Sequence, residues 1–391
     1  MGVKELLNLI PEDQIAFLAA ETGTDYKSKK LPVSILFKLL LYSQFEVKHN
    51  SLRVMGSIFD SYAFSHLAAK PMQQKIHYSS LSERLAGVDA NFFEQLYQYC
   101  RERFSIYLQP KGSKEEKLLR FDSTLISLSS KLLDIGFRSG GSQQHVKQLK
   151  FTIGYAGIPE YAAFHHEATY NGENIALRKA VLNCSSSKGH MVVFDAGLQS
   201  RDAYDQFCDQ GIRFITRIKV GPLNKPVEKN RLTDPVVGEE LTFITDQQTY
   251  LYARKGRKTA HTYRYIEAYK TGRPEQTIAF LTNAKELQTQ DVAALYKRRW
   301  DIEVFFKFLK QELNFSHLLS RSINGIKAVL YVRMILATLI LVYQKLNAIK
   351  GLKSAKQRFA QELEAELMMF IIRLYGGNPD QPPPASISKF W

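Results

Sequence analysis

The sequence predicts an α/β protein whose core is interrupted by a β-rich insertion and flanked by helical regions. Two apolar runs, 118–122 and 191–195, each end in an aspartate, and a helical segment lies between them. Residues 220–276 contain many turn formers between short β-prone stretches, whereas residues 1–105 and 313–375 follow helical patterns. Alternating strands and helices are typical of a partly parallel sheet covered by helices.

The charge balance points to a polyanionic partner. The chain has 391 residues, enough for two or three domains, and its 45% hydrophobic and 23% charged residues are ordinary for a globular protein. However, 53 Lys and Arg against 38 Asp and Glu give a net charge of +15. Such an excess favours nucleic acid or an acidic membrane surface. Because the cations are spread along the chain, we expect a broad folded surface for nucleic acid.

Cysteine usage and hydropathy predict a soluble cytoplasmic protein. The three cysteines, Cys100, Cys184 and Cys208, are odd in number and lack metal-ligand spacing, which indicates reduced thiols. The N-terminus has no signal-peptide core and no acylation motif. The longest apolar run, Ala328 to Tyr343, is short and contains Arg333, so we predict a buried core helix and no membrane span.

The first 110 residues are expected to be helical. Helices are predicted over 33–42, 51–59 and 91–104, and another begins at Ser80, which has capping-box spacing to Glu83. Short basic helices suit a helix-turn-helix-like DNA-binding module, and a plain helical bundle with solvated lysines fits this segment equally well. The cations concerned are Lys27, Lys29, Lys30, Lys38, Lys48 and Arg53.

The core begins with a strand that ends at Asp122. A hairpin follows, with strands over 149–156 and 161–170, and then a helix over 174–182. The next strand ends at Asp195, after which Ser200 caps a helix, Arg201 to Cys208, and residues 212–219 form another strand. Lys147 and Lys150, near the start of the hairpin, are expected either to contact DNA or to be solvated.

The insertion is predicted to contain a β-hairpin with a basic tip. Its strands are expected over 249–253 and 262–266, and a core strand returns at 276–282. The tip contains four cations in five residues, Arg254, Lys255, Arg257 and Lys258, and is a candidate for DNA contact. The alternative is a solvated loop.

One helix is predicted to run from Val292 to beyond Lys310. On a helical projection Tyr296, Arg299, Glu303 and Lys310 lie on one side. Apolar residues cover most of the remaining circumference, so we expect a helix buried nearly all round. These residues are Trp300, Ile302, Val304, Phe305, Phe308 and Leu309. The polar stripe is either a salt-bridged seam of the core or part of a site.

Three carboxylates are candidates for one metal centre. Asp122 and Asp195 follow strands, and ligands of open α/β sheets bind beyond the carboxyl ends of the strands. With Glu303 they would form an oxygen-rich site for Mg²⁺ or Mn²⁺. Two such ions can activate a water or a 3′-hydroxyl and stabilise the leaving oxygen of a phosphodiester. Arg299 and Lys310 would then bind phosphates, and Tyr296 would hydrogen-bond the same backbone.

At these residues the chain resembles a known family. The spacing Tyr296-x2-Arg299-x3-Glu303-x6-Lys310 is similar to the YREK signature of bacterial insertion-sequence DDE transposases, which have a ribonuclease-H-like core. Asp122-Ser123-Thr124 and Asp195-Ala196-Gly197 resemble the surroundings of the first two catalytic acids, and Thr216 to Lys219 resembles the end of the strand before the insertion. The resemblance covers roughly residues 117 to 345.

The resemblance implies cut-and-paste DNA transposition by an α/β protein with a ribonuclease-H-like core. Asp122, Asp195 and Glu303 would hold two Mg²⁺ or Mn²⁺ ions, while Tyr296, Arg298, Arg299 and Lys310 would contact DNA. The implied partners are transposon-end inverted repeats and target DNA, bound by a homodimer in the bacterial cytoplasm at the nucleoid, without a membrane. The implied organisation is a helical DNA-binding domain (1–110), the catalytic domain (111–219 and 277–318), the insertion (220–276) and a helical C-terminal region with a Pro-rich tail (319–391).

Two alternative functions remain at this point. A nuclease of the same fold would use the same carboxylates without strand transfer. A transposase-derived DNA-binding protein would have lost catalysis, although all six signature residues are present here.

The His165-His166-Glu167 run resembles a metal site, but neighbouring strand residues point to opposite faces, so we expect a structural role. The only tryptophans, Trp300 and Trp391, lie outside the insertion, which leaves open whether an aromatic residue there holds a flipped base.

Overall fold

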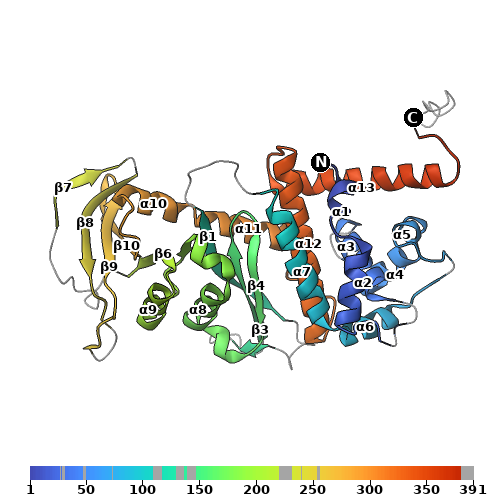
Figure 1. Cartoon of the computed structure of the whole chain (residues 1–391), viewed down its shortest axis with the longest axis horizontal. Coiled ribbons are helices and arrows are strands. Elements are labelled where there is room, and N and C mark those ends of the chain that lie inside the picture. Colours follow the sequence, from blue (N-terminus) through green and yellow to red (C-terminus); the bar gives the residue numbers. More distant parts are fainter. Residues whose placement is uncertain are drawn as a thin grey trace. The chain divides into compact units, whose positions relative to one another are not determined.

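A computed structural model describes residues 1–108, 117–128, 136–138, 147–219, 231–252 and 256–379, apart from 27, 29, 30, 47–49, 73 and 239. The chain divides into two compact units, one made of residues 1–109 and 308–391 and the other of residues 110–307. The first is a helical unit and the second contains the sheet (Figure 1).

The helical unit contains the N-terminal helices and the two long C-terminal ones. Their bounds are α1 (Val3–Leu7), α2 (Glu12–Glu21), α3 (Val33–Glu46), α4 (Leu52–Phe59), α5 (Tyr62–Leu67), α6 (Tyr78–Gly87), α7 (Ala90–Ser105), α12 (Ile323–Leu346) and α13 (Leu352–Leu374). The predicted helices over 33–42, 51–59 and 91–104 are confirmed as α3, α4 and α7. The predicted start at Ser80 is wrong, because α6 begins at Tyr78, where His77 Nδ1 accepts the hydrogen bond from the Ser79 N–H.

The long apolar helix α12 packs against α3, α6, α7 and α13 within this unit. Among the described residues it is the one helix long and apolar enough to cross a membrane, and 94% of its most apolar window is buried in the structure. Its residues from Gly325 to Tyr343 are almost all buried, including Arg333. This agrees with the predicted core helix.

A single mixed sheet forms the centre of the second unit. Its strands are β1 (Leu118–Ser127), β2 (Phe137–Arg138), β3 (Lys147–Tyr155), β4 (Pro159–His165), β5 (Met191–Phe194), β6 (Arg213–Ile218), β7 (Arg231–Val237), β8 (Leu241–Thr249), β9 (Tyr263–Lys270) and β10 (Arg273–Thr282). They are ordered β2-β3-β1-β5-β6-β10-β9-β8-β7, and β4 pairs with β3. The pairs β1–β5 and β5–β6 are parallel, and the other pairs are antiparallel. The predicted α/β class is confirmed.

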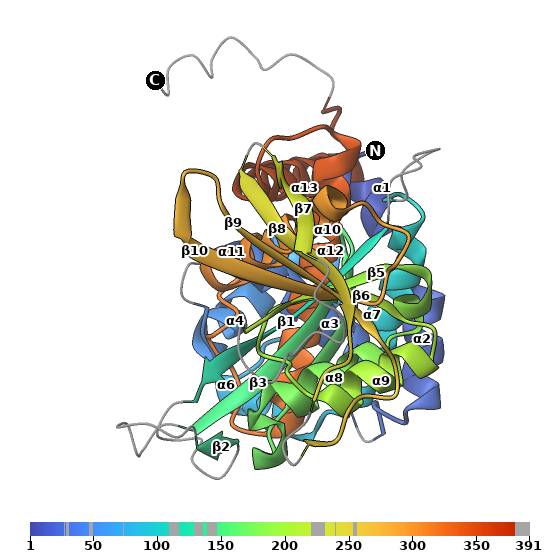
Figure 2. The ribbon, with the colours of Figure 1, turned by 90° about the vertical axis from the view of Figure 1, so that its left-hand side faces the viewer.

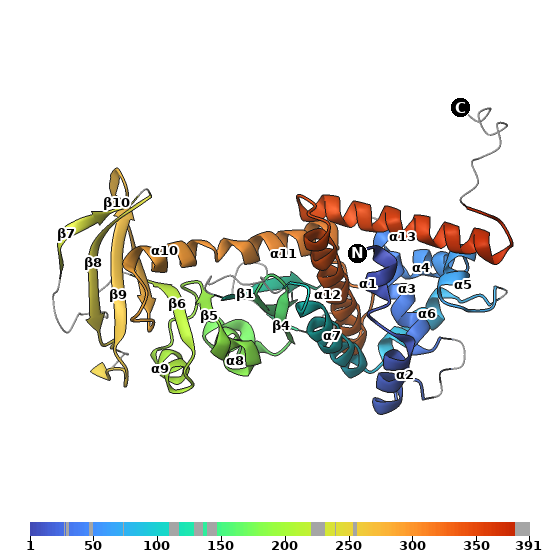
Figure 3. The ribbon, with the colours of Figure 1, turned by 45° about the horizontal axis from the view of Figure 1, so that its top comes forward.

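Helices cover both faces of the parallel part of the sheet. On one face α8 (Glu173–Asn183) and α9 (Arg201–Asp209) bury side chains such as Leu177, Tyr204 and Phe207. On the other face α10 (Thr289–Lys297) buries Val292 against Val193 and Phe280. Figure 3 shows α10 along one side of the strands and α8 and α9 along the other. Two 3₁₀ turns, η2 (Ala168–Asn171) and η3 (Ser185–Gly189), precede and follow α8.

The insertion continues the same sheet. Strand β8 pairs with β9, and β9 pairs with β10, so the insertion's strands extend the core sheet beyond β6 (Figure 2). The predicted strand over 249–253 is wrong, because β8 ends at Thr249. Thr245, Gln247 and Thr249 are buried positions of β8, but their side chains are polar. The sequence of β8 therefore lacks the alternation of apolar and polar residues by which a strand is predicted.

Candidate active site

Asp122 lies just past the end of a parallel ladder. The last parallel pair between β1 and β5 is Phe121 with Phe194. Strand β1 continues to Ser127, paired only with β3, so the predicted strand end at Asp122 is wrong. The position is nevertheless the carboxyl end of the parallel part of the sheet. The Ser123 N–H donates to Asp122 Oδ1 over 2.7 Å, which fixes the carboxylate there.

Asp195 directly follows β5, as predicted, and is held in a tight turn. Its Oδ1 accepts the Gly197 N–H over 2.9 Å, and its carbonyl accepts the Thr216 hydroxyl from β6 over 2.9 Å. A Cβ atom on Gly197 would lie 2.9 Å from Asp195 Oδ1, so the close approach requires glycine.

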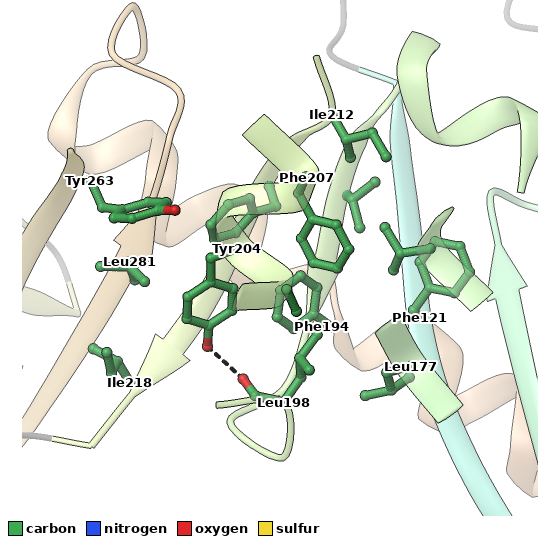
Figure 4. Packing of buried hydrophobic residues seen from close by; sticks show 14 of the residues in the cluster. Phe121, Leu177, Phe194, Leu198, Tyr204, Phe207, Ile212, Ile218, Tyr263 and Leu281 are labelled. Carbon is green, nitrogen blue, oxygen red and sulfur yellow. Dashed lines mark hydrogen bonds between the residues drawn. The ribbon is translucent and has the colours of Figure 1, made fainter. Parts of the chain in front are cut away.

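The aromatic core beneath this turn anchors it. Phe194 packs against Tyr204, Phe207 and Phe214. The Tyr204 hydroxyl, fully buried, donates to the Leu198 carbonyl over 2.5 Å, which ties the chain after Asp195 to α9 (Figure 4). The N-terminus of α9 is capped by Ser200, whose Oγ accepts the Ala203 N–H, as the sequence predicted. The second aspartate therefore sits on a rigid support.

Arg299 connects the first aspartate to Glu303. Its Nη1 lies 3.9 Å from Asp122 Oδ2, and its Nη2 forms an ion pair with Glu303 Oε1. The guanidinium also lies over the Tyr296 ring, 5.9 Å from its centroid. Four residues predicted for the site, Asp122, Tyr296, Arg299 and Glu303, are thus brought together from β1, α10, the turn after it and the following helix.

The predicted single helix is in fact two. Helix α10 ends at Lys297 and α11 (Trp300–Glu312) begins after Arg298 and Arg299. The buried Arg120 of β1 explains the interruption, because its Nε donates to the Arg298 carbonyl over 2.7 Å and its Nη2 pairs with Asp301 over 2.7 Å. The Arg298 carbonyl also accepts the Asp301 N–H over 3.2 Å, so the strand arginine adds a second hydrogen bond to a carbonyl at the interruption. No local pattern in the sequence indicates this role of Arg120.

The predicted burial all round the helix is also wrong. Trp300 is 62% exposed and Val304 is 48% exposed. The opposite side is apolar and covered: Phe305 stacks on Tyr155 with ring centroids 4.8 Å apart. Helix α11 is therefore amphipathic, and the residues beside Arg299 and Glu303 face solvent.

The pKa of Asp122 is raised by its burial and by neighbouring acids. Burial raises the pKa of Asp122 to about 7. The Ser123 N–H and the Arg299 guanidinium lower that pKa, whereas the charges of Asp195 and Glu173 raise it further. Glu173, on α8, was not among the residues predicted for the site.

The donor set suits a hard divalent cation, although its members are not gathered around one point. No three His, Cys, Asp or Glu side chains in the described part of the chain lie close enough together to hold a metal ion. The three predicted acids present only carboxylate oxygens, the ligand type that Mg²⁺ and Mn²⁺ prefer. Asp122 is half-buried among other acids and has a cation, Arg299, beside it. The residues therefore fit such an ion chemically, with Arg299 providing the counter-charge.

The structure also describes four other cations that the sequence predicted to contact DNA. Arg298 is exposed, and Lys310 is exposed on α11 within the helical unit. Arg257 pairs with Asp202 of α9, and Lys258 lies over the Tyr250 ring, 4.5 Å from its centroid. Arg254 and Lys255 are outside the described residues, as are Lys27, Lys29, Lys30 and Lys48 of the N-terminal region.

Two further expectations concern the hairpin strands. His165 stacks on Tyr170 with ring centroids 4.0 Å apart, in keeping with a structural role. Both expectations for Lys150 are wrong, because its side chain is 2% exposed and pairs with Glu173.

Comparison with known proteins shows the family to which the chain is similar. Residues 114–339, more than half of the chain, match the family model described as "Transposase DDE domain". A putative transposase of Sinorhizobium fredii is 28% identical over 161 residues, which are 41% of this chain and 44% of that protein. A probable transposase for insertion sequence element IS5377 of Geobacillus stearothermophilus is 23% identical over 264 residues, 64% of this chain and 63% of that protein.

Two more similarities extend over most of the chain. A putative transposase for insertion sequence element IS4SA of Synechocystis is 24% identical over 280 residues, 68% of this chain and 72% of that protein. The match to the first relative spans less than half of that protein's length. A solved piggyBac transposase synaptic complex with hairpin DNA has a TM-score of 0.48 at 11% identity, covering 97% of this chain and 83% of that one.

Proposed function

The chain belongs to the transposase DDE domain family, and on that premise we propose that it is a DNA transposase that cuts at the ends of a mobile element and joins them to target DNA. The observation that supports this most directly is the Arg299 contact with Asp122 and Glu303 at the carboxyl end of the parallel strands. The signature spacing further supports membership of the YREK subgroup.

In the proposed site Asp122, Asp195 and Glu303 would hold two Mg²⁺ or Mn²⁺ ions. Bound there, the ions would supply activation of a water or 3′-hydroxyl and stabilisation of the leaving oxygen. The rigid turn after β5 orients Asp195, and the Ser123 N–H orients Asp122. Arg299 neutralises Asp122 and Glu303 in the free protein and contacts a DNA phosphate in the complex. Tyr296, beneath that guanidinium, hydrogen-bonds the same strand, and Lys310 and Arg298 bind neighbouring phosphates.

The proposed partners are the inverted repeats of a transposon and target DNA. The net charge of +15 supports a polyanionic partner. Residues 1–110 would form the DNA-binding domain and residues 220–276 an accessory contact, while residues 319–391 complete the helical region. We propose a homodimer on paired ends, acting on the nucleoid in the cytoplasm.

The test is cleavage of a labelled duplex containing the DNA that flanks this gene. The native chain should nick it at a fixed end in Mg²⁺ or Mn²⁺, and Glu303→Gln should bind it without cutting. Glu275→Gln, which changes an exposed glutamate of β10, should cut like the native chain. Joined products with a target plasmid would distinguish a transposase from a nuclease of the same fold. Native protein that binds the duplex but never cuts it would overturn the proposal in favour of a DNA-binding relic.

A further inference from the structure

A fourth carboxylate, Glu173, lies against the turn that holds Asp195. It is the first residue of α8, with Gly172 as the N-cap. A Cβ atom built on Gly197 would lie 2.9 Å from Asp195 Oδ1 and 3.0 Å from Glu173 Cγ. The two acidic side chains therefore approach the same glycine from different elements, one from the end of β5 and the other from α8.

A buried cation fixes one oxygen of this carboxylate. Lys150 Nζ lies 2.7 Å from Glu173 Oε1 and donates to the Asn171 carbonyl over 2.7 Å. The Lys150 side chain is 2% exposed. Burying an ammonium group is costly unless it is paired and hydrogen-bonded. Two acceptors therefore hold Lys150 in place, and Lys150 in turn determines where Glu173 Oε1 lies.

The second oxygen has no such partner. Glu173 Oε2 is buried and accepts no hydrogen bond from any described residue. Leaving a buried acceptor without a hydrogen bond destabilises a folded protein, and the cost is larger for a charged group. A carboxylate at the start of a helix is favourable electrostatically, but that effect does not require one oxygen to be both buried and unpaired. A ligand that supplies positive charge or a donor would satisfy this oxygen.

We propose that Glu173 is a fourth carboxylate of the active site, with Oε2 available to a divalent cation or to a water in its hydration shell beside Asp122 and Asp195. Lys150 is a positioning residue that acts through Glu173 Oε1. This inference rests on the proposed metal-dependent function. The proposal adds Glu173, on α8, to the three acids on β1, after β5 and on α11.

The experiment measures Mn²⁺ binding by electron paramagnetic resonance on the full chain, with the flanking duplex present. Glu173→Gln should raise the Kd for Mn²⁺ about 10-fold to 100-fold, the usual range for residues that support a metal site. Lys150→Gln should shift it in the same direction. Two matched controls should leave the Kd unchanged: Glu275→Gln on β10, and Lys188→Gln at an exposed lysine of η3.

A double variant separates a metal role from a purely structural ion pair. Lys150→Met combined with Glu173→Gln removes both charges of the buried pair, which commonly preserves stability better than removing one. Thermal unfolding by circular dichroism checks that it folds. Weak Mn²⁺ binding by a folded double variant supports the proposal. Native Mn²⁺ affinity in that variant overturns it.

Different results would overturn the proposed function and the role of Glu173. Native protein that neither binds Mn²⁺ nor cuts DNA would overturn the proposed function, and the role of Glu173 with it. Native protein that binds and cuts, alongside a double variant with an unchanged Kd, would overturn only the role of Glu173 and leave the transposase proposal standing.

Discussion

The guanidinium of Arg299 lies between two acids from different elements, with Nη1 3.9 Å from Asp122 Oδ2 on β1 and Nη2 paired with Glu303 on α11. A side-chain cation thus contacts two of the three acids proposed to bind metal. Removing it would leave both carboxylates without that counter-charge, in a partly buried place where repulsion is poorly screened. A divalent cation would then be bound more readily.

We therefore expect Arg299→Gln to destabilise the metal-free protein by roughly 1–3 kcal/mol and to gain more stability from Mn²⁺ than the native chain does. Urea unfolding with EDTA and with Mn²⁺ measures both effects. Lys297→Gln is the control, because Lys297 forms a solvent-exposed pair with Glu240 that contributes little to stability. Equal gains from Mn²⁺ in the native and Arg299→Gln proteins would contradict the expectation.

The raised pKa of Asp122 predicts how stability depends on pH. Because burial raises this pKa to about 7 from the ordinary value of 3.8, the folded protein binds more protons than the unfolded chain between these values. Stability without metal should therefore fall as the pH rises from about 4 to about 7. Asp122→Asn imitates the protonated group and should remove this slope, leaving the variant more stable at pH 8 by on the order of a few kcal/mol.

Urea unfolding in EDTA at pH 5 and pH 8 tests this difference. The advantage of Asp122→Asn over the native chain should be larger at pH 8 than at pH 5. A variant that loses stability relative to the native chain as the pH rises would show that the carboxylate is stabilised in its charged form.

A glycine at position 197 should be required for DNA cleavage but not for folding of the chain. In Gly197→Ala the new methyl group would meet Asp195 Oδ1 and Glu173 Cγ at about 3 Å, which displaces one of the two acids. We expect at least a tenfold loss of cleavage, with the melting temperature lowered by only a few degrees. Gly189→Ala is the matched control, since nothing lies within 4 Å of its added Cβ. Native cleavage by Gly197→Ala would mean that neither acid needs its present position.

The ion pair between Arg257 and Asp202 should exchange readily for a DNA phosphate. Both side chains are more than half exposed, so the pair contributes little to stability. Arg257→Gln should weaken binding of the flanking duplex and reduce the slope of log K against log salt by about 1. Fluorescence anisotropy across a salt series measures this slope, with Lys188→Gln, an exposed site on η3, as the control. An unchanged slope would place Arg257 outside the DNA contact.

Local patterns in the sequence were enough to predict the elements that support the site. The strand ending before Asp195, the helix capped by Ser200 and the hairpin before α8 each depend on neighbouring residues, through apolar runs, a capping hydroxyl and a turn. The spacing of Tyr296, Arg299 and Glu303 likewise predicted that these side chains would lie together, and they do.

Contacts between residues that are far apart in the sequence determine the features that local patterns did not predict. The interruption between α10 and α11 depends on Arg120, which lies 178 residues before the carbonyl that it binds. The burial of Lys150 depends on Glu173 and Asn171, which follow it by more than twenty residues. A lysine or an arginine in a sequence looks the same whether it is solvated or buried, and here Lys150 and Arg120 are buried beside acids that are distant in sequence, Glu173 and Asp301. The sequence by itself therefore determined which acids this protein presents, and the tertiary structure determined which cations neutralise and orient them.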